Sequence, residues 1–187
     1  MISEKVTIEQ LAEKLQVSKN TVVQDLRPAE EFLKKHEVRL IKKSYYGMSL
    51  KGEEEQIRNT LFNLYIKTAS EGSLNILHIL KDHAEVDPEA GRNMIRRVEA
   101  AMGIRFADES IGELESMILA SLCRIRCGFH VRGRTLDDAD GVCREAILSG
   151  LPGFQVTKGD LSYFVMLFQS TKGWTGRVLK IGMRTAG

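Results

Sequence analysis

Apolar residues near the start of the chain recur with the period of an α-helix, over residues 8–15 and again over residues 18–26. In the first stretch they occupy positions i, i+3, i+4 and i+7: Ile8, Leu11, Ala12 and Leu15. Thr7 precedes this stretch and Gln10 stands three residues later, which is the spacing of a capping box. Ser18 is a good N-cap for the second stretch, in which Val22 and Leu26 face inward. The pattern predicts two short helices that meet across a turn at residues 16–17.

The polar residues of the second predicted helix gather at its N-terminus. Base-edge and phosphate contacts in a helix-turn-helix come from this part of the second helix. The candidate DNA-contacting residues are Ser18, Lys19, Asn20, Thr21 and Gln24. A helical hairpin that binds nothing is the alternative. The small Ala12, which permits a close helix crossing, and the cap directly before Lys19 favour the DNA-binding interpretation.

Residues 38–52 indicate two short β segments around a basic turn that ends at Gly47. This arrangement is typical of the wing in a winged helix-turn-helix. Lys42, Lys43 and Tyr45 would then lie near the wing and support DNA binding from there. Between the second helix and the wing, Pro28 lacks the amide that would bond back to Gln24, so we expect a kink or a restart of the helix at that point.

The remainder of the chain predicts helices and no convincing strand. Glu53 opens a helix with an acidic first turn, and further helices are expected at about residues 74–83, 87–102, 108–128, 135–147 and 158–171. Two of them carry clear apolar faces, formed by Leu114, Met117, Ile118, Leu122 and Ile125 and by Leu161, Phe164, Val165 and Phe168. The expected architecture is mainly α: a winged helix-turn-helix over 1–52, an all-α bundle over 53–172 and a tail over 173–187.

The overall composition does not indicate a function, but the distribution of charged residues along the chain does. The 187 residues are 43% hydrophobic and carry a net charge of +2, which is typical of an ordinary globular protein. Residues 18–51 hold eight Lys and Arg against four Asp and Glu, an excess of four positive charges over the predicted second helix and wing. A segment long and apolar enough to span a membrane and a signal peptide are both missing from the sequence, so a cytoplasmic location is expected.

The sequence offers little that would support catalysis or a cofactor. Cys123, Cys127 and Cys143 are an odd number, and neither a histidine nor a carboxylate completes a metal-ligand spacing with them. A glycine-rich phosphate loop and a paired nucleophile and base are also missing. We therefore expect a protein that is not an enzyme and binds neither a metal nor a cofactor.

The end of the predicted wing carries a family pattern. Gly47, Leu50, Gly52, Ile57 and Arg58 fit the motif Gly-x-x-Leu-x-Gly-x-Glu-x-x-Ile-Arg, with an acidic run at its glutamate position. With the helix-turn-helix over residues 8–26, this resembles the transcription regulators of the BglG/MtlR type that carry PTS-regulation domains. The resemblance covers the chain to about residue 172 and is strongest over residues 6–66. It implies a PRD-like helical regulatory domain after the winged helix.

Proteins of this type control sugar-uptake operons in bacteria, and phosphotransferase-system proteins phosphorylate histidines in their regulatory domains. In the register of this sequence, the usual histidine positions hold Met117 and Leu167. The resemblance therefore implies a regulatory fold without these phosphorylation sites. His130, just past the helix with Arg124, is closest to where such sites cluster, and a structural or solvated role is expected for it.

Two functions are carried forward from the sequence. One is a sequence-specific regulator that binds double-stranded DNA, dimerises through its helical domain and, by the resemblance, interacts with phosphotransferase-system proteins. The other is a protein-interaction module that no longer binds DNA, because a first helix before residue 8 is missing. Both ends look cut, so a fragment of a longer regulator, or a reduced member of the family, is expected.

Overall fold

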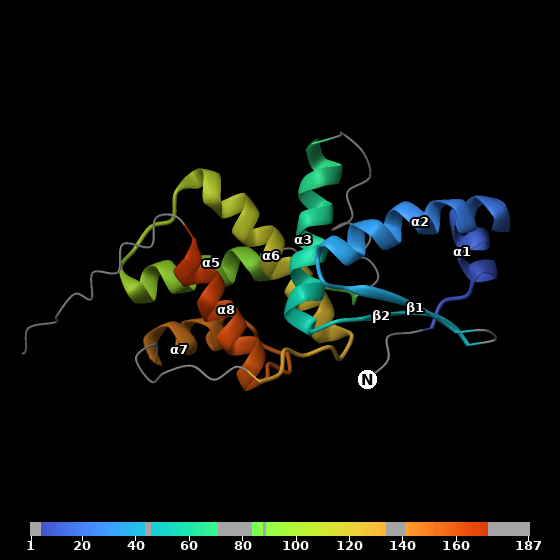
Figure 1. Ribbon diagram of the computed structural model, residues 1–187. Coiled ribbons are helices and arrows are strands. Elements are labelled where there is room, and N and C mark those ends of the chain that lie inside the picture. Colours follow the sequence, from blue (N-terminus) through green and yellow to red (C-terminus); the bar gives the residue numbers. More distant parts are fainter. Residues whose placement is uncertain (1–4, 44–45, 71–83, 88, 134–140, 172–187) are drawn as a thin grey trace, which may run out of the picture. The chain divides into compact units, whose positions relative to one another are not determined.

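The described part of the chain is mainly helical, with one small antiparallel sheet in its N-terminal third (Figure 1). A computed structural model describes residues 5–43, 46–70, 84–87, 89–133 and 141–171. The chain divides into two compact units, Met1–Ile76 and Leu77–Gly187, which are taken in turn below. The predicted fold class, a winged helix-turn-helix together with a helical domain, is confirmed.

The first helix, α1, spans Ile8–Leu15 and begins with the predicted capping box. The Gln10 side chain accepts a hydrogen bond from the Thr7 amide at 2.8 Å, and the Thr7 hydroxyl accepts one from the Gln10 amide at 3.2 Å. These two bonds satisfy amides that the first helical turn leaves without a backbone partner. Gln16, at φ 55°, ends α1 in the left-handed region and starts the turn into the next helix.

Helix α2 spans Lys19–Lys35 and runs through Pro28 without a break in the helical assignment. Of the two expected outcomes at this proline, a restart is therefore wrong, and a kink stays a prediction. Pro28 removes one hydrogen bond to the Gln24 carbonyl, but Gln24 is exposed and water can reach that oxygen. Phe32 and Leu33 are half-buried in the second half of α2, and packing of this half offsets the lost bond.

The wing consists of β1, Arg39–Lys43, and β2, Gly47–Lys51, paired antiparallel with Lys43 opposite Gly47. Val6 extends this sheet by one bridge to Met48, through backbone hydrogen bonds of 2.7 and 3.1 Å. Gly47 has φ +81°, and a Cβ on it would lie 2.8 Å from the Val6 carbonyl oxygen. A glycine is needed here on both counts. Helix α3, Glu54–Ser70, follows the wing within the same unit.

Over its described residues, the second unit is a bundle of helices. It contains α5 Glu89–Met102, α6 Asp108–Arg126, α7 Gly141–Ser149 and α8 Lys158–Ser170. Helix α5 packs on α6 and α7, and α8 packs on α6 and α7. Their shared core includes the predicted apolar faces, with Leu114, Ile118, Leu122, Ile125, Phe164, Val165 and Phe168 all buried. Helix α5 starts where it was predicted, and the Asp87 carboxylate accepts a hydrogen bond from the Glu89 amide at 3.0 Å.

Several predictions fall outside the described residues. These are the helix expected at 74–83, the start signal at Pro88, the first residues of the helix expected from Thr135, and the tail from residue 173.

Candidate nucleic-acid interface

The N-terminus of α2 is fixed by the hydroxyl groups of Ser18 and Thr21. The Ser18 hydroxyl accepts a hydrogen bond from the Thr21 amide at 3.1 Å, and the two hydroxyl oxygens lie 2.8 Å apart. This is the predicted N-cap, and it aligns the first turn of α2. Ser18 and Thr21, two of the predicted DNA-contacting residues, thus have a structural role at the cap. Ser18 is exposed and Thr21 is half-buried.

Lys19 is exposed but already has an anionic partner. Its Nζ donates a hydrogen bond to the Glu9 carboxylate of α1 at 2.8 Å. The side chains of Lys19 and Glu9 are 62% and 61% exposed. The ammonium of Lys19 lowers the pKa of Glu9, mainly through this hydrogen bond. The ion pair joins α1 to α2 across the turn, and a DNA phosphate would have to compete with Glu9 for Lys19.

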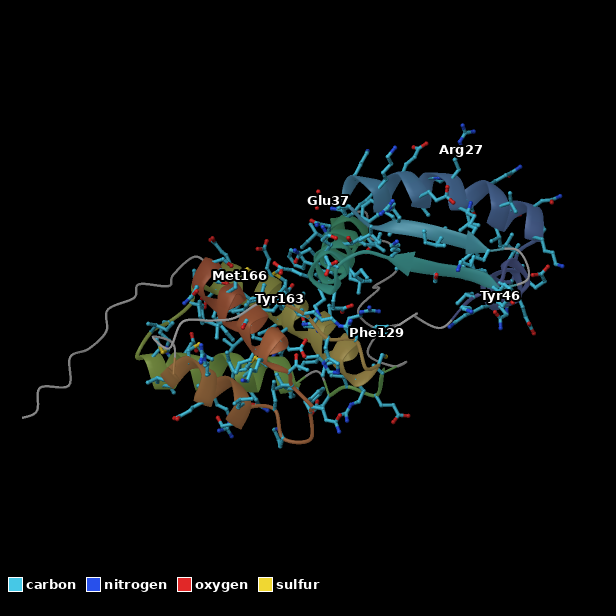
Figure 2. All side chains as sticks on the ribbon, turned by 60° about the horizontal axis from the view of Figure 1, so that its bottom comes forward. Arg27, Glu37, Tyr46, Phe129, Tyr163 and Met166 are labelled. Carbon is cyan, nitrogen blue, oxygen red and sulfur yellow. The ribbon has the colours of Figure 1, made fainter. Side chains whose placement is uncertain are left out.

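Asn20 and Gln24 are exposed on one face of α2, four residues apart. Their amide groups can form the paired hydrogen bonds that read an adenine edge in the major groove. Arg27 is exposed three residues after Gln24, and its side chain extends from α2 away from the two strands (Figure 2). Arg27 was not among the contact residues predicted from the sequence. Its position at i+7 from Asn20 was the available signal, since that spacing keeps the helical face.

The wing presents its lysines in two different states. Lys42 forms an ion pair with Glu30 of α2, whereas Lys43 is exposed at the end of β1. Tyr45, also expected to support DNA binding, lies outside the described residues. Its neighbour Tyr46 is 63% exposed after the wing turn, and the Lys5 ammonium lies 4.9 Å from the centre of its ring. The wing therefore offers cationic and aromatic groups close together.

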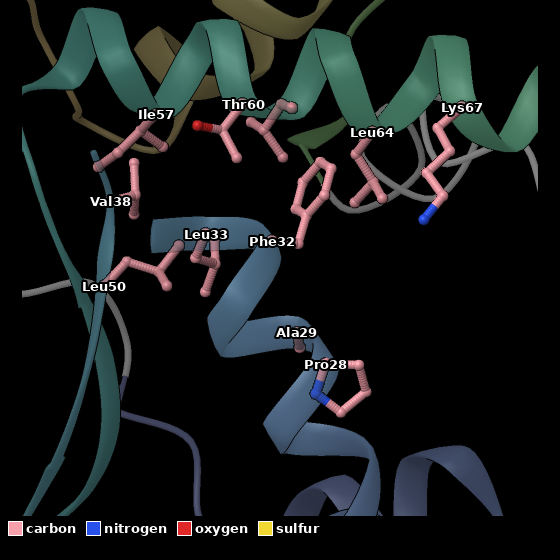
Figure 3. A pocket seen from close by; sticks show the side chains of 11 residues that line it. Pro28, Ala29, Phe32, Leu33, Val38, Leu50, Ile57, Thr60, Leu64 and Lys67 are labelled. Carbon is pink, nitrogen blue, oxygen red and sulfur yellow. The ribbon is translucent and has the colours of Figure 1, made fainter. Parts of the chain in front are cut away.

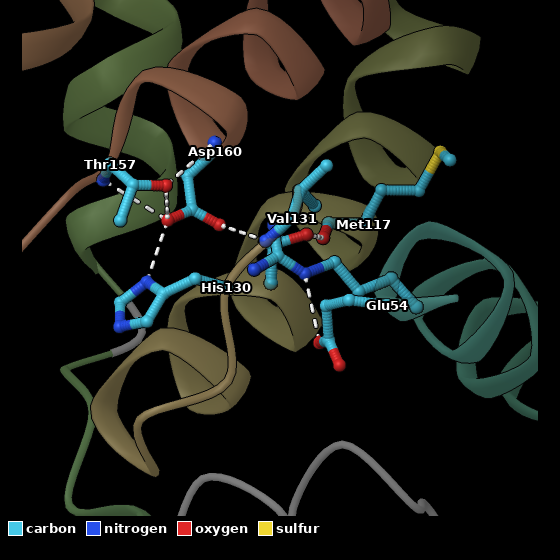
Figure 4. Close-up of polar contacts among 8 residues, drawn as sticks. Glu54, Met117, His130, Val131, Thr157 and Asp160 are labelled. Atoms are coloured by element: carbon cyan, nitrogen blue, oxygen red, sulfur yellow. Dashed lines mark hydrogen bonds and ion pairs between the residues drawn. The ribbon is translucent and has the colours of Figure 1, made fainter. Parts of the chain in front are cut away.

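The second unit contains a buried polar cluster at the start of α8 (Figure 4). The Asp160 carboxylate is fully buried and accepts hydrogen bonds from the Val131 amide at 3.1 Å and from the Thr157 amide and hydroxyl at 3.1 and 2.7 Å. His130 Nδ1 lies 2.7 Å from Asp160 Oδ2 and is held by it. The half-buried His130 thus has a structural partner, and of the two roles expected from the sequence, structural or solvated, this contact fits the structural one.

The positions that the family resemblance assigned to phosphorylated histidines are apolar here. Met117 is half-buried on α6 and Leu167 is buried on α8. The three cysteines are not in disulfide bonds, and burial raises the pKa of Cys123 to about 12, which keeps this thiol protonated at neutral pH. Over the described ranges, clusters of three or more His, Cys, Asp or Glu side chains suited to a metal ion are missing. Among the same residues, helices long and apolar enough to span a membrane are likewise missing.

Comparison with protein-family models gives a match for the N-terminal part of the chain. Residues 1–65 match the family model of the Mga helix-turn-helix domain, which is about a third of the 187 residues. A search among curated proteins finds no match. The matched range contains α1, α2, the wing and most of α3, and therefore every predicted DNA-contacting residue. The match supports DNA-binding transcription regulation.

Proposed function

We propose that this chain is a sequence-specific transcription regulator of a bacterial sugar-uptake operon of the phosphotransferase system, acting in the cytoplasm. Helix α2 enters the major groove with its N-terminal half, and the wing contacts the sugar-phosphate backbone. The observation that carries the proposal is the exposed face of α2 that holds Asn20, Gln24 and Arg27, within a range that matches a helix-turn-helix domain.

The proposed contacts divide into two kinds. Asn20, Gln24 and Arg27 read base edges, because amide and guanidinium groups form paired hydrogen bonds with adenine and guanine. The backbone contacts are proposed for Ser18, Lys19, Thr21, Lys42, Lys43 and Tyr45, since hydroxyl and ammonium groups bind phosphate oxygens and carry no sequence information.

The second unit is proposed as a PRD-like regulatory domain that pairs two copies of the chain. A single helix-turn-helix binds weakly, and a dimer places two α2 helices on half-sites about one DNA turn apart, about 34–36 Å. Since Met117 and Leu167 occupy the usual histidine positions, the domain is proposed to dimerise without receiving phosphate there. The proposed division of the chain is 1–52 for DNA binding and 53–172 for the helical domain, which adds α3 of the first compact unit to the helices of the second. Any contact with phosphotransferase-system proteins then rests on surface recognition.

A salt titration tests the proposal on the full chain. Fluorescence anisotropy with labelled genomic fragments should find fragments that bind at least about 10³-fold more tightly than random DNA at physiological salt. Lys42→Ala with Lys43→Ala should weaken binding to all sequences and reduce the slope of log K against log salt by up to about two. The charge-matched control, Lys34→Ala with Lys35→Ala at the exposed end of α2, should leave the slope unchanged.

Base reading is tested by Asn20→Ala and Gln24→Ala. Each should cost about 1–3 kcal/mol on the preferred fragment and little on random DNA. Glu31→Ala, at an exposed position in the second half of α2, is the control that should change neither affinity. Equal losses on both DNAs would contradict base reading by α2.

The alternative is a protein-interaction module that no longer binds DNA. Its supporting observation is that Leu15, Val17 and Val23 are 59%, 38% and 53% exposed around the turn between α1 and α2. Apolar side chains gathered at one place favour a protein partner. A mobility-shift assay with genomic fragments separates the two, because specific retention at physiological salt excludes this alternative.

A further inference from the structure

The first unit contains an apolar cavity of about 440 Å³ between the second half of α2, the wing and α3 (Figure 3). Phe32 and Leu33 line it from α2, Leu50 from the wing, and Leu61 and Leu64 from α3. Four of these five side chains are half-buried, and Leu50 is 36% exposed. Large apolar side chains from three elements therefore converge on space that they do not fill, and the volume is within the 300–1,000 Å³ range of small-molecule sites.

Polar groups are scarce on the cavity walls. Thr60 lies in the wall, but its hydroxyl donates a hydrogen bond to the Gln56 carbonyl at 2.7 Å. Lys67 is the charged residue among those that line the cavity, and its ammonium lies 5.8 Å from the centre of the Phe32 ring. A cation is thus held at one end of an apolar chamber. The complementary molecule has an apolar body and one anionic end.

The size of the cavity decides between a small molecule and a protein segment. One turn of α-helix, about 10–12 Å across with side chains and about 5.4 Å long, occupies about 500 Å³. The cavity is about the size of a single turn, so a docked helix would be held over only about one turn of its length. A flexible alkyl chain fits the same space without this limit.

We propose that this cavity binds a small amphipathic carboxylate, with its alkyl chain among Phe32, Leu33 and Leu64 and its carboxylate at the Lys67 ammonium. The site lies in the second half of α2, whereas the residues proposed to read DNA lie in the first half. The proposal therefore goes beyond DNA binding and does not rest on it. The ligand titrations below contain no DNA, so a failure of carboxylate binding is distinguished from a failure of DNA binding.

Calorimetric titration of the full chain with hexanoate, octanoate and decanoate, all below their micelle concentrations, tests the binding chemistry. Burial of each methylene contributes about 0.8 kcal/mol, so affinity should rise about fourfold per methylene along the series. Decyltrimethylammonium, with the same chain and the opposite charge, should bind more weakly than decanoate. A lack of saturable decanoate binding overturns the proposal, and equal affinity for the two decyl compounds overturns the role of Lys67.

Variants test the location. Lys67→Gln should weaken decanoate binding by up to about fivefold and leave decanol binding unchanged, because an exposed ion pair contributes up to about 1 kcal/mol. Lys35→Gln, at an exposed position of α2 that does not line the cavity, is the matched control.

A second pair of variants blocks the cavity sterically. Ala29→Trp fills it from an exposed position on α2 and should abolish decanoate binding, whereas Glu31→Trp, two residues later and outside the lining, should not. Unchanged decanoate affinity in Ala29→Trp places the ligand elsewhere and overturns the proposal. Circular dichroism checks that both tryptophan variants fold. If Ala29→Trp does not fold, the Lys67→Gln comparison decides the location.

Discussion

Replacement of Asp160 should destabilise the helical unit more than any surface change, because this carboxylate joins three parts of the chain. It accepts hydrogen bonds from Val131 and His130, which follow α6, and from Thr157, the N-cap of α8. Asp160 is 0% exposed, so water cannot replace it when it is removed. In Asp160→Ala, the buried Val131 amide loses its acceptor and the α8 cap loses one half of its capping box.

The magnitude follows from burial and charge. Loss of the acceptor of the buried Val131 amide costs about 1–3 kcal/mol, and loss of the capping contacts with Thr157 adds about 0.5–2 kcal/mol. In urea, with an m-value of about 1–3 kcal/mol/M, this lowers the unfolding midpoint by at least about 0.5 M. Unfolding is followed by far-ultraviolet circular dichroism. His130→Ala removes one bond to the carboxylate and should cost about 1.5–3 kcal/mol, the range for a charge-assisted hydrogen bond.

A matched control is present in the same chain. Gln10 fills the equivalent position in the capping box of α1, but it is exposed. Gln10→Ala should therefore cost only about 0.5–1.5 kcal/mol, the value of an ordinary hydrogen bond. Equal effects of Asp160→Ala and Gln10→Ala would refute the reasoning, since burial of the charge would then contribute nothing. If Asp160→Ala fails to fold, His130→Ala is compared with Gln10→Ala instead. A larger loss of unfolding free energy in His130→Ala then shows the contribution of the buried carboxylate.

Three further predictions concern other contacts. Glu9→Gln should strengthen DNA binding by up to about fivefold in an anisotropy titration, because it frees Lys19 from an exposed ion pair, whereas Glu13→Gln on the same helix should do so less. The pKa of Glu9 is lowered in the folded chain by Lys19, so this pair stabilises the fold above the unfolded pKa of Glu9 and stops doing so as the pH falls through the folded one. The unfolding free energy should therefore fall less between neutral and acid pH in Glu9→Gln than in the unchanged chain. The same pH dependence in both would contradict the pairing. Gly159→Ala should lower the melting temperature, because its Cβ would lie 2.0 Å from the Val131 carbonyl oxygen. Gly112→Ala, in the second turn of α6 with open space around its Cβ, should raise the melting temperature through the higher helix propensity of alanine.

Local signals in the sequence were sufficient to place the helix-turn-helix. The Thr7 and Gln10 pair and the Ser18 cap act over three residues, so their outcome depends little on the rest of the fold. The wing was predictable for a similar reason, since Gly47 supplies a positive φ at the start of β2. Helical spacing also placed the core faces of α6 and α8, because burial of an apolar stripe is what holds a bundle together.

The ion pairs and the buried polar cluster that the sequence did not reveal depend on contacts between separate elements. The acceptors of Lys19 and Lys42 are Glu9 and Glu30, which lie ten and twelve residues away along the chain. Asp160 lies in the first turn of the helix expected at about 158–171, but its role as a buried acceptor needs the segment after α6 to return to α8. Pair energies of this kind are invisible to periodicity and propensity, which describe one element at a time.

These ion pairs change how the proposed DNA interface should work. With Lys19 and Lys42 held by glutamates, the free chain presents fewer available cations to phosphates than its charge count suggests. Non-specific binding, which comes almost entirely from phosphate neutralisation, is weakened by this, whereas the uncharged amides of Asn20 and Gln24 are unaffected. A correct operator that repositions the two lysines onto phosphates gains contacts that random DNA does not. The acidic partners are therefore expected to increase discrimination between sites at the expense of overall affinity.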